Sequence, residues 1–495
     1  MRFSTRSLIT SISGMSLLSA CITAPENPPA TTIAMPASIT HPAAAGAEEP
    51  PDKWWSLYRE PALDALVEEA LANNRDLRAA SARLLEARAV LSEAHAARLP
   101  ETGLSVEAGR GSTLEDQIAA SGAGSDHVRT GPRFGFGTDI SWEVDLWGRI
   151  GATEKVAIAN MREAAALQDG LRVAVAAETT RAWLDACGHA RQADMARQSL
   201  AFAERGRDLA QSLRAAGAGS PADVLRAETL AAQASAAVPP VEAARRSALA
   251  ELAVLTGHPP TEPPAAAIAC VRLPSMAAII PVGDGAALLR RRPDIRAAEQ
   301  KLAGGTARIG IAVADLYPRI SLGGGLAMSS PSIAGLDARR NRVWRFGPLL
   351  SWSFPNISIA RARIRQARAS EIAALAAFDA VILNALREVN QAAEVYSAAL
   401  RRMDALRVAA DRAGRARRLV WIQRSAGAAT ALDMLDADRT DMEAQAALAS
   451  AEMEVATAQV VLFKALGGGW QSAPPVILPL PERPSSIASS AISSK

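Results

Sequence analysis

The chain alternates between two patterns of apolar and polar residues. Within residues 62–98, apolar residues recur every three or four positions between arginines and glutamates, which predicts an amphipathic helix. Residues 101–109 and 133–142 instead alternate with a period of two, which predicts strands. Two further helical stretches follow at 152–216 and 221–256, and a glycine-rich turn separates them. This half of the chain therefore reads helix, strand, strand, long helix, helix.

The second strand shows the alternation most clearly. Phe134, Phe136 and Trp142 fall on one face, whereas Asp139 and its glycine and serine neighbours fall on the other. A barrel strand that faces lipid on one side and water on the other has this pattern, and so does a half-buried hairpin of a water-soluble protein. Residues 110–132 are rich in glycine, serine, aspartate and threonine, and we expect them to form a loop.

The whole arrangement occurs twice. Short segments return at a constant offset in the second half, and the offset changes once, between Leu104 and Phe136, so the loop there tolerates insertions. The matching segments include Asp76-Leu77-Arg78-Ala79-Ala80 with Asp294-Ile295-Arg296-Ala297-Ala298, Phe136-Gly137 with Phe346-Gly347, and Gly217 with Gly427. The second repeat predicts strands at 318–328 and 344–354 and helices at 286–316, 363–426 and 431–466.

The two long helices indicate an elongated architecture. Each has about 65 residues and would reach roughly 95 Å, or about three bilayer cores. The shorter helices of a repeat together match this length, so we expect two short helices to stack along each long one. The repeats, 54–257 and 286–467, are joined by a proline-rich connector at 258–285, which we expect at the midpoint of the tube wall. Pro239-Pro240 is expected to interrupt and kink the helix at 221–256.

The predicted strands are too few to close a barrel within one chain. Four strands leave two open edges, and a membrane does not tolerate open sheet edges. Three copies would supply twelve strands, which lies within the range of membrane barrels. The fold class predicted is therefore mainly α with a membrane β-barrel, built from two tandem repeats of helix, strand, strand, long helix and helix, in which three copies would close one barrel.

The first 20 residues are expected to be a signal peptide. Arg2 and Arg6 precede a short apolar run, which is too short to cross a bilayer as a helix and ends in Leu18-Ser19-Ala20-Cys21. This ending resembles the lipobox of bacterial lipoproteins, in which the cysteine becomes the new N-terminus and carries a diacylglycerol and an acyl chain. The alternative is an ordinary secretory signal with a chance cysteine.

The lipoprotein interpretation predicts where the protein is located, and composition describes the two ends of the mature chain. Family knowledge of lipoprotein sorting associates aspartate after the lipidated cysteine with the inner membrane, so Ile22 favours the outer membrane. Residues 21–53 and 468–495, rich in proline, alanine or serine, are expected to be a tether and a tail. No later run reaches about 18 apolar residues, so we expect no transmembrane helix.

Composition excludes several classes of function. The formal net charge is +3, and loss of the signal peptide would reduce it further, so the chain lacks the basic character of a nucleic-acid-binding protein. The five histidines are scattered, and neither a His-Glu-x-x-His pattern nor a phosphate-binding glycine loop occurs. We expect no metal, no other cofactor than the covalent lipid, and no enzymatic activity.

Two cysteines remain in the expected mature chain besides the lipid-bearing one. Cys187 and Cys270 would lie in a compartment that permits a disulfide, but the sequence does not give the distance between them. Two free, part-buried thiols are the simpler interpretation, and we prefer it.

Several motifs together resemble one known family. They are Trp54-Trp55, Asn74-Arg75-Asp76-Leu77, Glu143-Val144-Asp145-Leu146-Trp147-Gly148-Arg149, Leu289-Arg290-Arg291-Arg292-Pro293-Asp294-Ile295, Tyr317-Pro318 and Gly217-Ala218-Gly219-Ser220-Pro221-Ala222-Asp223-Val224-Leu225. Over about 54–470 the chain resembles the TolC family of outer-membrane efflux proteins, in its lipoprotein, NodT-like branch. The resemblance implies a trimeric exit duct, with a twelve-stranded outer-membrane barrel on an α-helical barrel in the periplasm. It also implies that the duct docks onto a periplasmic adaptor and an inner-membrane pump, and a proton-driven pump of the RND type is the expected partner.

The resemblance also implies a gate at the lower end of the helical tube. The positions that match it are Leu432, Asp433, Asp436, Asp223 and Arg226. Asp433 and Asp436 share a helix face, and threefold symmetry would make a ring of six carboxylates that favours cations. The alternative is that these are solvated residues of a helix start, where the helix dipole favours acids.

Two further groups of residues are candidates for contact. The turns at the tube tip are expected to contact the adaptor, and turn chemistry alone also explains their composition; these residues are Gly217, Ala218, Gly219, Ser220, Gly427, Ala428 and Thr430. Tryptophans near the strand ends are expected at the membrane interface, with packing at the strand–helix junction as the alternative; these residues are Trp142, Trp147, Trp344 and Trp352.

We therefore expect an outer-membrane channel that passes small molecules, such as drugs or toxic compounds, out of the cell. Two alternatives remain open at this point. One is an exit duct for ATP-driven protein secretion, and the other is a periplasmic structural lipoprotein without a pore.

Overall fold

The structure is a computed structural model that describes residues 25–31, 33, 51–276, 291–352 and 357–478. The expected signal peptide, Cys21, and parts of the tether, connector, strand 344–354, helix 286–316 and tail lie outside these residues. The chain divides into two compact units. Unit 1 comprises residues 1–31, 86–163 and 298–378, and unit 2 comprises residues 32–85, 164–297 and 379–495.

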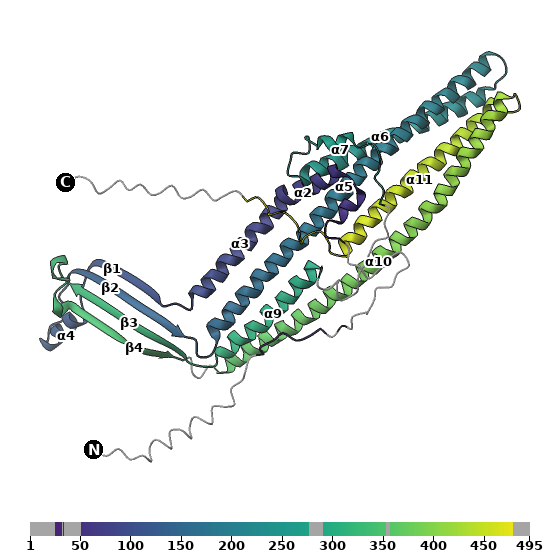
Figure 1. Ribbon diagram of the computed structural model, residues 1–495. Helices are drawn as coiled ribbons and strands as arrows, with labels where there is room; N and C mark the ends of the chain where they lie inside the picture. Colours follow the sequence, from purple (N-terminus) through teal and green to yellow (C-terminus); the bar gives the residue numbers. More distant parts are fainter. Residues whose placement is uncertain (1–24, 32, 34–50, 277–290, 353–356, 479–495) are drawn as a thin grey trace. The chain divides into compact units, whose positions relative to one another are not determined.

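Unit 1 contains a single antiparallel sheet of four strands in the order β1-β2-β3-β4 (Figure 1). The strands are β1 (Glu101–Gly111), β2 (Gly131–Val144), β3 (Arg319–Ser330) and β4 (Arg342–Ser351). Each repeat contributes one hairpin, and β2 pairs with β3 to join the two hairpins in one sheet. The strands lie where the period-two pattern predicts them, with ends that differ by a few residues.

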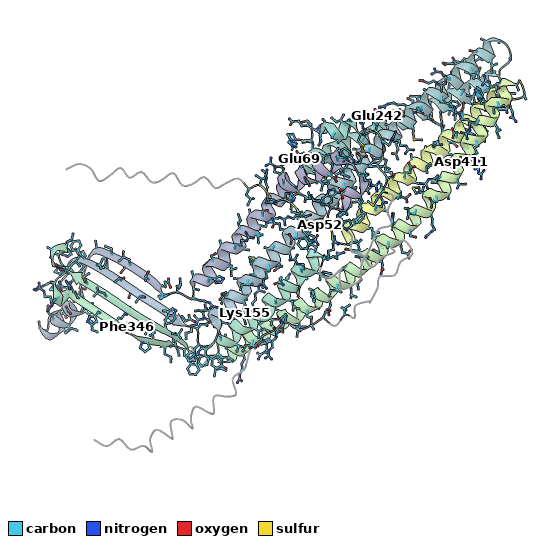
Figure 2. All side chains as sticks on the ribbon, viewed as in Figure 1. Asp52, Glu69, Lys155, Glu242, Phe346 and Asp411 are labelled. Carbon is cyan, nitrogen blue, oxygen red and sulfur yellow. A yellow bond between two sulfur atoms is a disulfide. The ribbon has the colours of Figure 1, made fainter. Side chains whose placement is uncertain are left out.

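The register collects the large apolar side chains on one face of the sheet. Thr138 of β2, for example, lies between Leu104 and Leu326, and Leu326 lies opposite Trp344. These side chains are mostly exposed, as Figure 2 shows for Phe346. The face comprises Leu104, Val106, Phe134, Phe136, Ile140, Trp142, Ile320, Leu322, Leu326, Met328, Trp344, Phe346 and Leu350. The opposite face is dominated by glycine, serine and charged residues.

The segment 110–132 is not a simple loop, as the composition suggested. It contains helix α4 (Leu114–Gly122), which begins with a capping box formed by Thr113 and Asp116. Thr113 accepts a hydrogen bond from the Asp116 amide, and the Asp116 carboxylate accepts one from the Thr113 amide at 2.8 Å. Arg133 of β2 pairs with Asp116 and ties the helix to the sheet. Short 3-10 turns, η3 (Ile333–Gly335) and η4 (Arg339–Asn341), occupy the β3–β4 connection.

The single helix expected at 62–98 is two helices. They are α2 (Pro61–Asn73) and α3 (Arg75–Ala96), and Asn74 between them has an extended ψ of 133°. The Asn74 side-chain oxygen accepts hydrogen bonds from the amides of Asp76 and Leu77 at 3.0 and 3.1 Å. Asparagine is among the best residues for this capping role, so it ends one helix and begins the next.

The remaining long elements are helical. They are α5 (Arg149–Ala215), α6 (Pro221–Leu255), α9 (Pro293–Ala314), α10 (Ile357–Ser425) and α11 (Ala431–Ala465). Helices α5 and α10 have 67 and 69 residues, as the uninterrupted helical pattern predicts. The expected interruption at Pro239-Pro240 is wrong, because α6 continues through both prolines. Both prolines are exposed.

The main hydrophobic core lies in unit 2. The turn η2 (Trp54–Tyr58) is buried in it, and the Trp54 ring stacks on Phe463 of α11 with 4.8 Å between ring centroids. Leucines and alanines of α2, α5, α6, α10 and α11 complete the core. A fully buried large aromatic pair contributes more apolar area than any of the surrounding alanines, so it anchors the start of the folded chain.

Two described helical segments are apolar and long enough to cross a membrane by composition alone. They are Ile357–Ser425, whose most apolar 18-residue window has a mean hydropathy of 1.6, and Leu432–Ala465, with a value of 1.3. The expectation from the sequence concerned uninterrupted runs of about 18 apolar residues, whereas these two windows meet a criterion of mean hydropathy that tolerates up to two charged residues. Interior helices of water-soluble proteins have the same composition, and alanine supplies much of it here.

Candidate functional site

Two tight turns in unit 2 form the ends of the helical hairpins α5–α6 and α10–α11 (Figure 1). Gly217 and Gly427 adopt left-handed backbone angles, with φ of 75° and 76°, which residues with a side chain adopt at a cost. Ala218 and Ala428 donate their amides to Leu213 and Gln423 at 2.9 and 2.8 Å. These hydrogen bonds close the preceding helices, and the tip residues lie exposed on the surface of the unit.

The return helices begin with matching capping boxes. Ser220 accepts a hydrogen bond from the Asp223 amide at 3.2 Å, and the Asp223 carboxylate accepts the Ser220 hydroxyl at 2.7 Å. Thr430 and Asp433 repeat the arrangement with distances of 3.1 and 2.7 Å. Hydrogen bonds from the hydroxyl and then from the amide of the cap residue lower the pKa of each carboxyl. Ser220 is therefore an N-cap, as its position before Pro221 predicts.

The candidate gate residues differ in how their side chains are used. The carboxylates of Asp223 and Asp433 accept hydrogen bonds from the N-cap residues of their own helices. Asp223 also forms an ion pair with Arg226 at 3.3 Å. Asp436, one turn further, pairs with Arg439 at 2.8 Å and caps nothing. Leu432 is 69% exposed. Each residue thus lies within the first two turns of its return helix in unit 2, Asp223 and Arg226 in α6 and Leu432, Asp433 and Asp436 in α11.

An ion pair joins the two helices of the second hairpin close to its tip. Arg417 of α10 pairs through Nε with Asp438 of α11, and its Nη1 lies 3.8 Å from Asp441. The counterpart of Arg417 in the first repeat is Arg207, which pairs instead with its neighbour Asp208. Helices α10 and α11 are therefore joined by charge close to the tip, whereas these residues do not join α5 to α6.

The four tryptophans lie in two kinds of surroundings, and their expected place at the membrane interface stays a prediction. Trp344 lies on the apolar face of the sheet and is 76% exposed. Trp142 and Trp352 are partly exposed and donate their indole N–H to backbone carbonyls of Arg98 and Leu316 at 2.9 and 3.3 Å. Trp147 instead stacks on Tyr317, with 4.5 Å between ring centroids, and packs at the strand–helix junction.

No metal site is present within the described ranges, where no group of three or more His, Cys, Asp or Glu side chains could hold an ion. The chemistry available at the tips is therefore that of backbone groups, carboxylates and guanidinium groups in water. Such groups attract or repel ions and dock other proteins.

Comparison with known proteins decides the family. The sequence profile described as outer membrane efflux protein matches residues 66–258 and again residues 286–468. The chain belongs to the outer membrane efflux protein family. The pyoverdine export outer membrane protein OpmQ of Pseudomonas putida is 30% identical over 468 residues, which cover 93% of this chain and 97% of OpmQ. Nodulation protein T of Rhizobium leguminosarum biovar trifolii is 29% identical over 462 residues, 92% of this chain and 96% of that protein.

A solved structure agrees with the sequence relatives. The outer-membrane channel OprN has a TM-score of 0.79 at 33% identity, over 90% of this chain and 99% of OprN. The resemblance to the TolC family and its NodT-like branch is confirmed, and the two profile matches confirm the tandem duplication. The protein is an outer-membrane efflux channel, an outer-membrane component of an efflux pump, with its helical tube in the periplasm.

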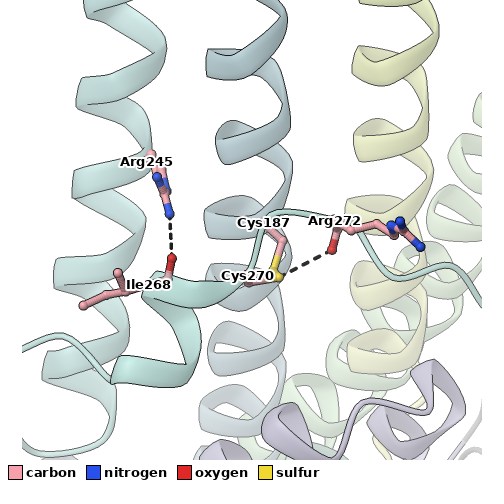
Figure 3. The surroundings of a disulfide bond; sticks show 5 residues. All are labelled: Cys187, Arg245, Ile268, Cys270 and Arg272. Atoms are coloured by element: carbon pink, nitrogen blue, oxygen red, sulfur yellow. Dashed lines mark hydrogen bonds between the residues drawn. A yellow bond between two sulfur atoms is a disulfide. The ribbon is translucent and has the colours of Figure 1, made fainter.

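The efflux channel has a disulfide that sequence reasoning did not favour. Cys187 of α5 and Cys270 are bonded, with 5.1 Å between their Cα atoms, so the preference for two free thiols is wrong (Figure 3). The bond fastens the described part of the connector to α5 just after α7 (Ala265–Ala269). Arg245 of α6 donates to the Ile268 carbonyl at 2.7 Å and holds the same segment from the other side. The sequence carried no signal for the pairing beyond the count of cysteines.

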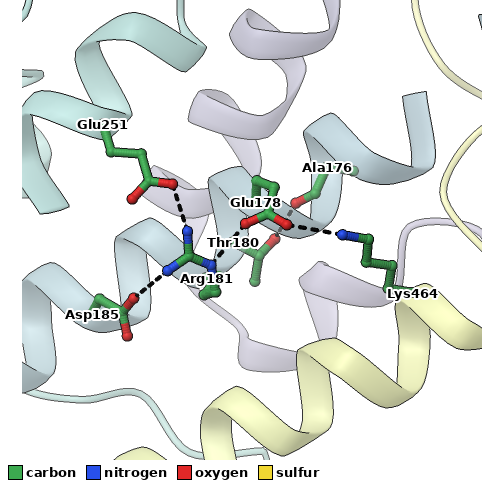
Figure 4. Close-up of polar contacts among 7 residues, drawn as sticks. All are labelled: Ala176, Glu178, Thr180, Arg181, Asp185, Glu251 and Lys464. Carbon is green, nitrogen blue, oxygen red and sulfur yellow. Dashed lines mark hydrogen bonds and ion pairs between the residues drawn. The ribbon is translucent and has the colours of Figure 1, made fainter. Parts of the chain in front are cut away.

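A charge network joins three helices of the efflux channel in unit 2. Arg181 of α5 contacts Glu178 at 2.7 Å, Asp185 at 3.0 Å and Glu251 of α6 at 2.5 Å, and Lys464 of α11 contacts Glu178 at 2.9 Å (Figure 4). Burial raises the pKa of Asp185 although Arg181 opposes the shift. Burial also acts to raise the pKa of Glu178, but hydrogen bonds from Lys464 and Arg181 outweigh it and lower this pKa.

The arginine–proline–aspartate motif has a structural role in unit 2. Arg292, mostly buried, donates to the Ala465 carbonyl at the end of α11 and to the carboxylates of Asp294 and Glu388, each at 2.7 Å. It thereby satisfies a carbonyl that the end of α11 leaves without a helical partner. The contact joins the start of α9 to α10 and α11, which explains why the motif precedes the second repeat's first helix.

Proposed function

We propose that three copies of the efflux channel close one twelve-stranded barrel and one helical tube. The observation that carries this proposal is the sheet of unit 1, whose apolar face ends at two open edges, β1 and β4. In a membrane, unpaired backbone groups at such edges cost several kcal/mol each. Pairing of β4 in one copy with β1 of the next satisfies them and continues the antiparallel order.

Helix α10 supports the same assembly. The most apolar 18-residue window of this helix has a mean hydropathy of 1.6, yet only 11% of the window is buried within one chain. A helix with so much exposed apolar surface needs a covering partner in a periplasmic setting. A second copy of the chain provides one if the helices of neighbouring copies line one tube.

The described end of the N-terminal segment supports a lipid anchor on Cys21. Pro25 and Pro28 line a groove of about 720 Å³ together with Trp147 and Tyr317 at the strand–helix junction of unit 1. Pro25 is four positions after Cys21 in the sequence, and an extended chain of that length reaches about 14 Å at most. The proposed diacylglycerol and acyl chain would therefore enter the membrane beside the strand ends.

The two tips are proposed to dock onto a periplasmic adaptor that connects the channel to a proton-driven inner-membrane pump. Their small, exposed residues leave backbone groups accessible, which suits a contact of matching shape with the adaptor. The gate is proposed in the helical turns that follow, at Leu432, Asp433, Asp436, Asp223 and Arg226. Small molecules are the proposed cargo. The name of the relative OpmQ refers to export of pyoverdine, a compound rather than a protein.

Two measurements test this proposal. Native mass spectrometry of the protein extracted in detergent should give a trimer, and a monomer that still conducts ions would overturn the closed twelve-stranded barrel. A photo-crosslinking residue at Ala218 should capture an adaptor in living cells, and one at the exposed Val271 of the connector serves as the control. Capture of an ATP-driven exporter together with the adaptor would contradict the proton-driven pump and favour secretion.

A further inference from the structure

One row of the sheet's polar face carries a charge pair. The register places Gly103 of β1, Asp139 of β2, Gly325 of β3 and Arg345 of β4 opposite one another. Successive residues of a strand point to opposite sides, so this row lies on the face away from Phe136 and the other apolar side chains. It is therefore on the side of the sheet that faces water in a membrane barrel.

The two charged residues lie on strands β2 and β4, and β3 lies between these strands. Arg345 donates from Nη2 to Oδ1 of Asp139 at 3.1 Å, although β2 and β4 are not neighbours. Strands two positions apart are separated by about 10 Å, so both side chains must lean over β3 to meet. The residue beneath them is Gly325.

Gly325 provides the space that the pair occupies. A Cβ atom there would lie 2.6 Å from Asp139 Oδ1 and 3.4 Å from Arg345 Nε. The backbone of Gly325 does not have a positive φ, so chain geometry does not demand glycine at this position. A side chain here would force the Asp139 carboxylate to move, so the ion pair in this geometry depends on the glycine.

Stability does not explain the arrangement. The side chains of Arg345 and Asp139 are 82% and 57% exposed, and exposed ion pairs contribute about 0–1 kcal/mol. Two other arginines of this face, Arg133 and Arg319, pair with acids outside the strands, Asp116 and Asp315. Arg345 differs from them because its partner belongs to the sheet, so both charges lie on the same wall.

We infer that the Asp139–Arg345 pair is a charge-balancing belt of the barrel lumen, which lets the barrel pass small solutes of either sign. The inference rests on the proposed closed trimer, in which the row occurs three times around the lumen. Rings of charge of one sign select ions in aqueous pores. Pairing each arginine with an aspartate prevents such a ring from forming at this level, and removal of either partner creates one.

A cysteine at Gly347 can report the local potential. Gly347 lies two residues from Arg345 on the same face, about 7 Å along the strand, and a Cβ there meets no atom within 4 Å. Cys187 and Cys270 are bonded to each other, so they do not compete for thiol reagents. The reporter is treated in intact cells with cationic and anionic methanethiosulfonates of similar size, and the ratio of the two rates is measured.

The expected changes have opposite signs. R345Q should raise the cation-to-anion rate ratio and D139N should lower it, each by about fivefold, because a unit charge some 7 Å away in water changes the local concentration of each reagent by roughly threefold before salt screening. The charge-swapped double variant Asp139→Arg, Arg345→Asp should return the ratio toward that of the reporter alone. R319Q, at the far end of β3, is the matched control and should leave the ratio unchanged.

Two outcomes would overturn the inference, and they separate it from the proposal on which it rests. If the reporter reacts in cells and the ratio is the same in every variant, the belt does not set the lumen potential, and the closed trimer stands. If the reporter is unreactive in intact cells but reacts in detergent, this face does not line an open lumen, and the proposed barrel fails together with the belt.

Discussion

Removal of the Cys187–Cys270 disulfide should destabilise the helical part of the efflux channel by several kcal/mol. The bond joins residues 83 positions apart. In the chain-entropy model, a loop of this length contributes about 4.5 kcal/mol by restricting the unfolded chain. The unfolding entropy is about 2.1 cal/mol/K per residue, so for about 400 residues that unfold together the loss lowers the midpoint by about 5 °C.

Cys270→Ser is the variant that isolates this effect. Cys270 is partly exposed, so a hydroxyl there is solvated, whereas Cys187 is fully buried in the core and remains as a small apolar side chain. Substitution of Cys187 itself would add a packing defect. Helix content is followed by circular dichroism during heating of the detergent-purified protein, with and without reductant.

The wild-type protein without reductant should melt highest, and the reduced wild-type protein should melt together with Cys270→Ser. The variant should be insensitive to reductant, which controls for effects of the reductant on other groups. Equal midpoints for oxidised and reduced wild-type protein, in samples where a thiol assay shows both cysteines free, would refute the reasoning. The connector would then be held by its other contacts, such as the one from Arg245.

Three further predictions concern the tips and the start of α9. Asp436→Ala should raise single-channel conductance and lower cation selectivity in planar bilayers, and unchanged currents would contradict the gate. Hydrogen bonds hold the folded pKa of Asp223 and Asp433 below the ordinary 3.8, so capping is complete above that pH and is lost as the pH falls through the lowered values. The protection of amides in the first turns of α6 and α11 against hydrogen exchange, measured relative to the intrinsic rate at each pH, should therefore fall only in this acidic range. Arg292→Lys should lower the melting midpoint, since a lysine does not reproduce the forked contacts to Asp294, Glu388 and the end of α11, and a midpoint equal to wild type would refute that role.

The sequence predicted the elements whose signals are local or repeated. Alternation with period two placed the four strands, because each residue's face depends only on its position along the strand. The duplication could be read directly, since Asp76 and Asp294 begin the same segment in each half. Glycine followed by serine or threonine placed both tip turns and the N-cap at Ser220.

The features that the sequence analysis missed fall into two classes. The break at Asn74 and the helix after Thr113 had local signals, namely an asparagine before Asp76 and a threonine three residues before Asp116. Periodicity outweighed the first signal, and loop-like composition outweighed the second. The disulfide had no such signal, because the approach of Cys270 to α5 depends on how the connector packs in unit 2.

The gate candidates at the two hairpin tips differ in what holds their carboxylates. Duplication preserved the cap pairs Ser220–Asp223 and Thr430–Asp433, since each helix start has amides that need acceptors. The next turn is not constrained in this way, and there the halves diverged, with Arg226 in one and Asp436 in the other. The Asp433 carboxylate is bonded to the Thr430 amide of its own helix start, whereas Asp436 contacts only the exposed side chain of Arg439, and an exposed ion pair contributes about 0–1 kcal/mol. If the proposed gate selects cations, Asp436 is therefore the residue on which selectivity depends, and Asp433 acts mainly by shaping the helix start.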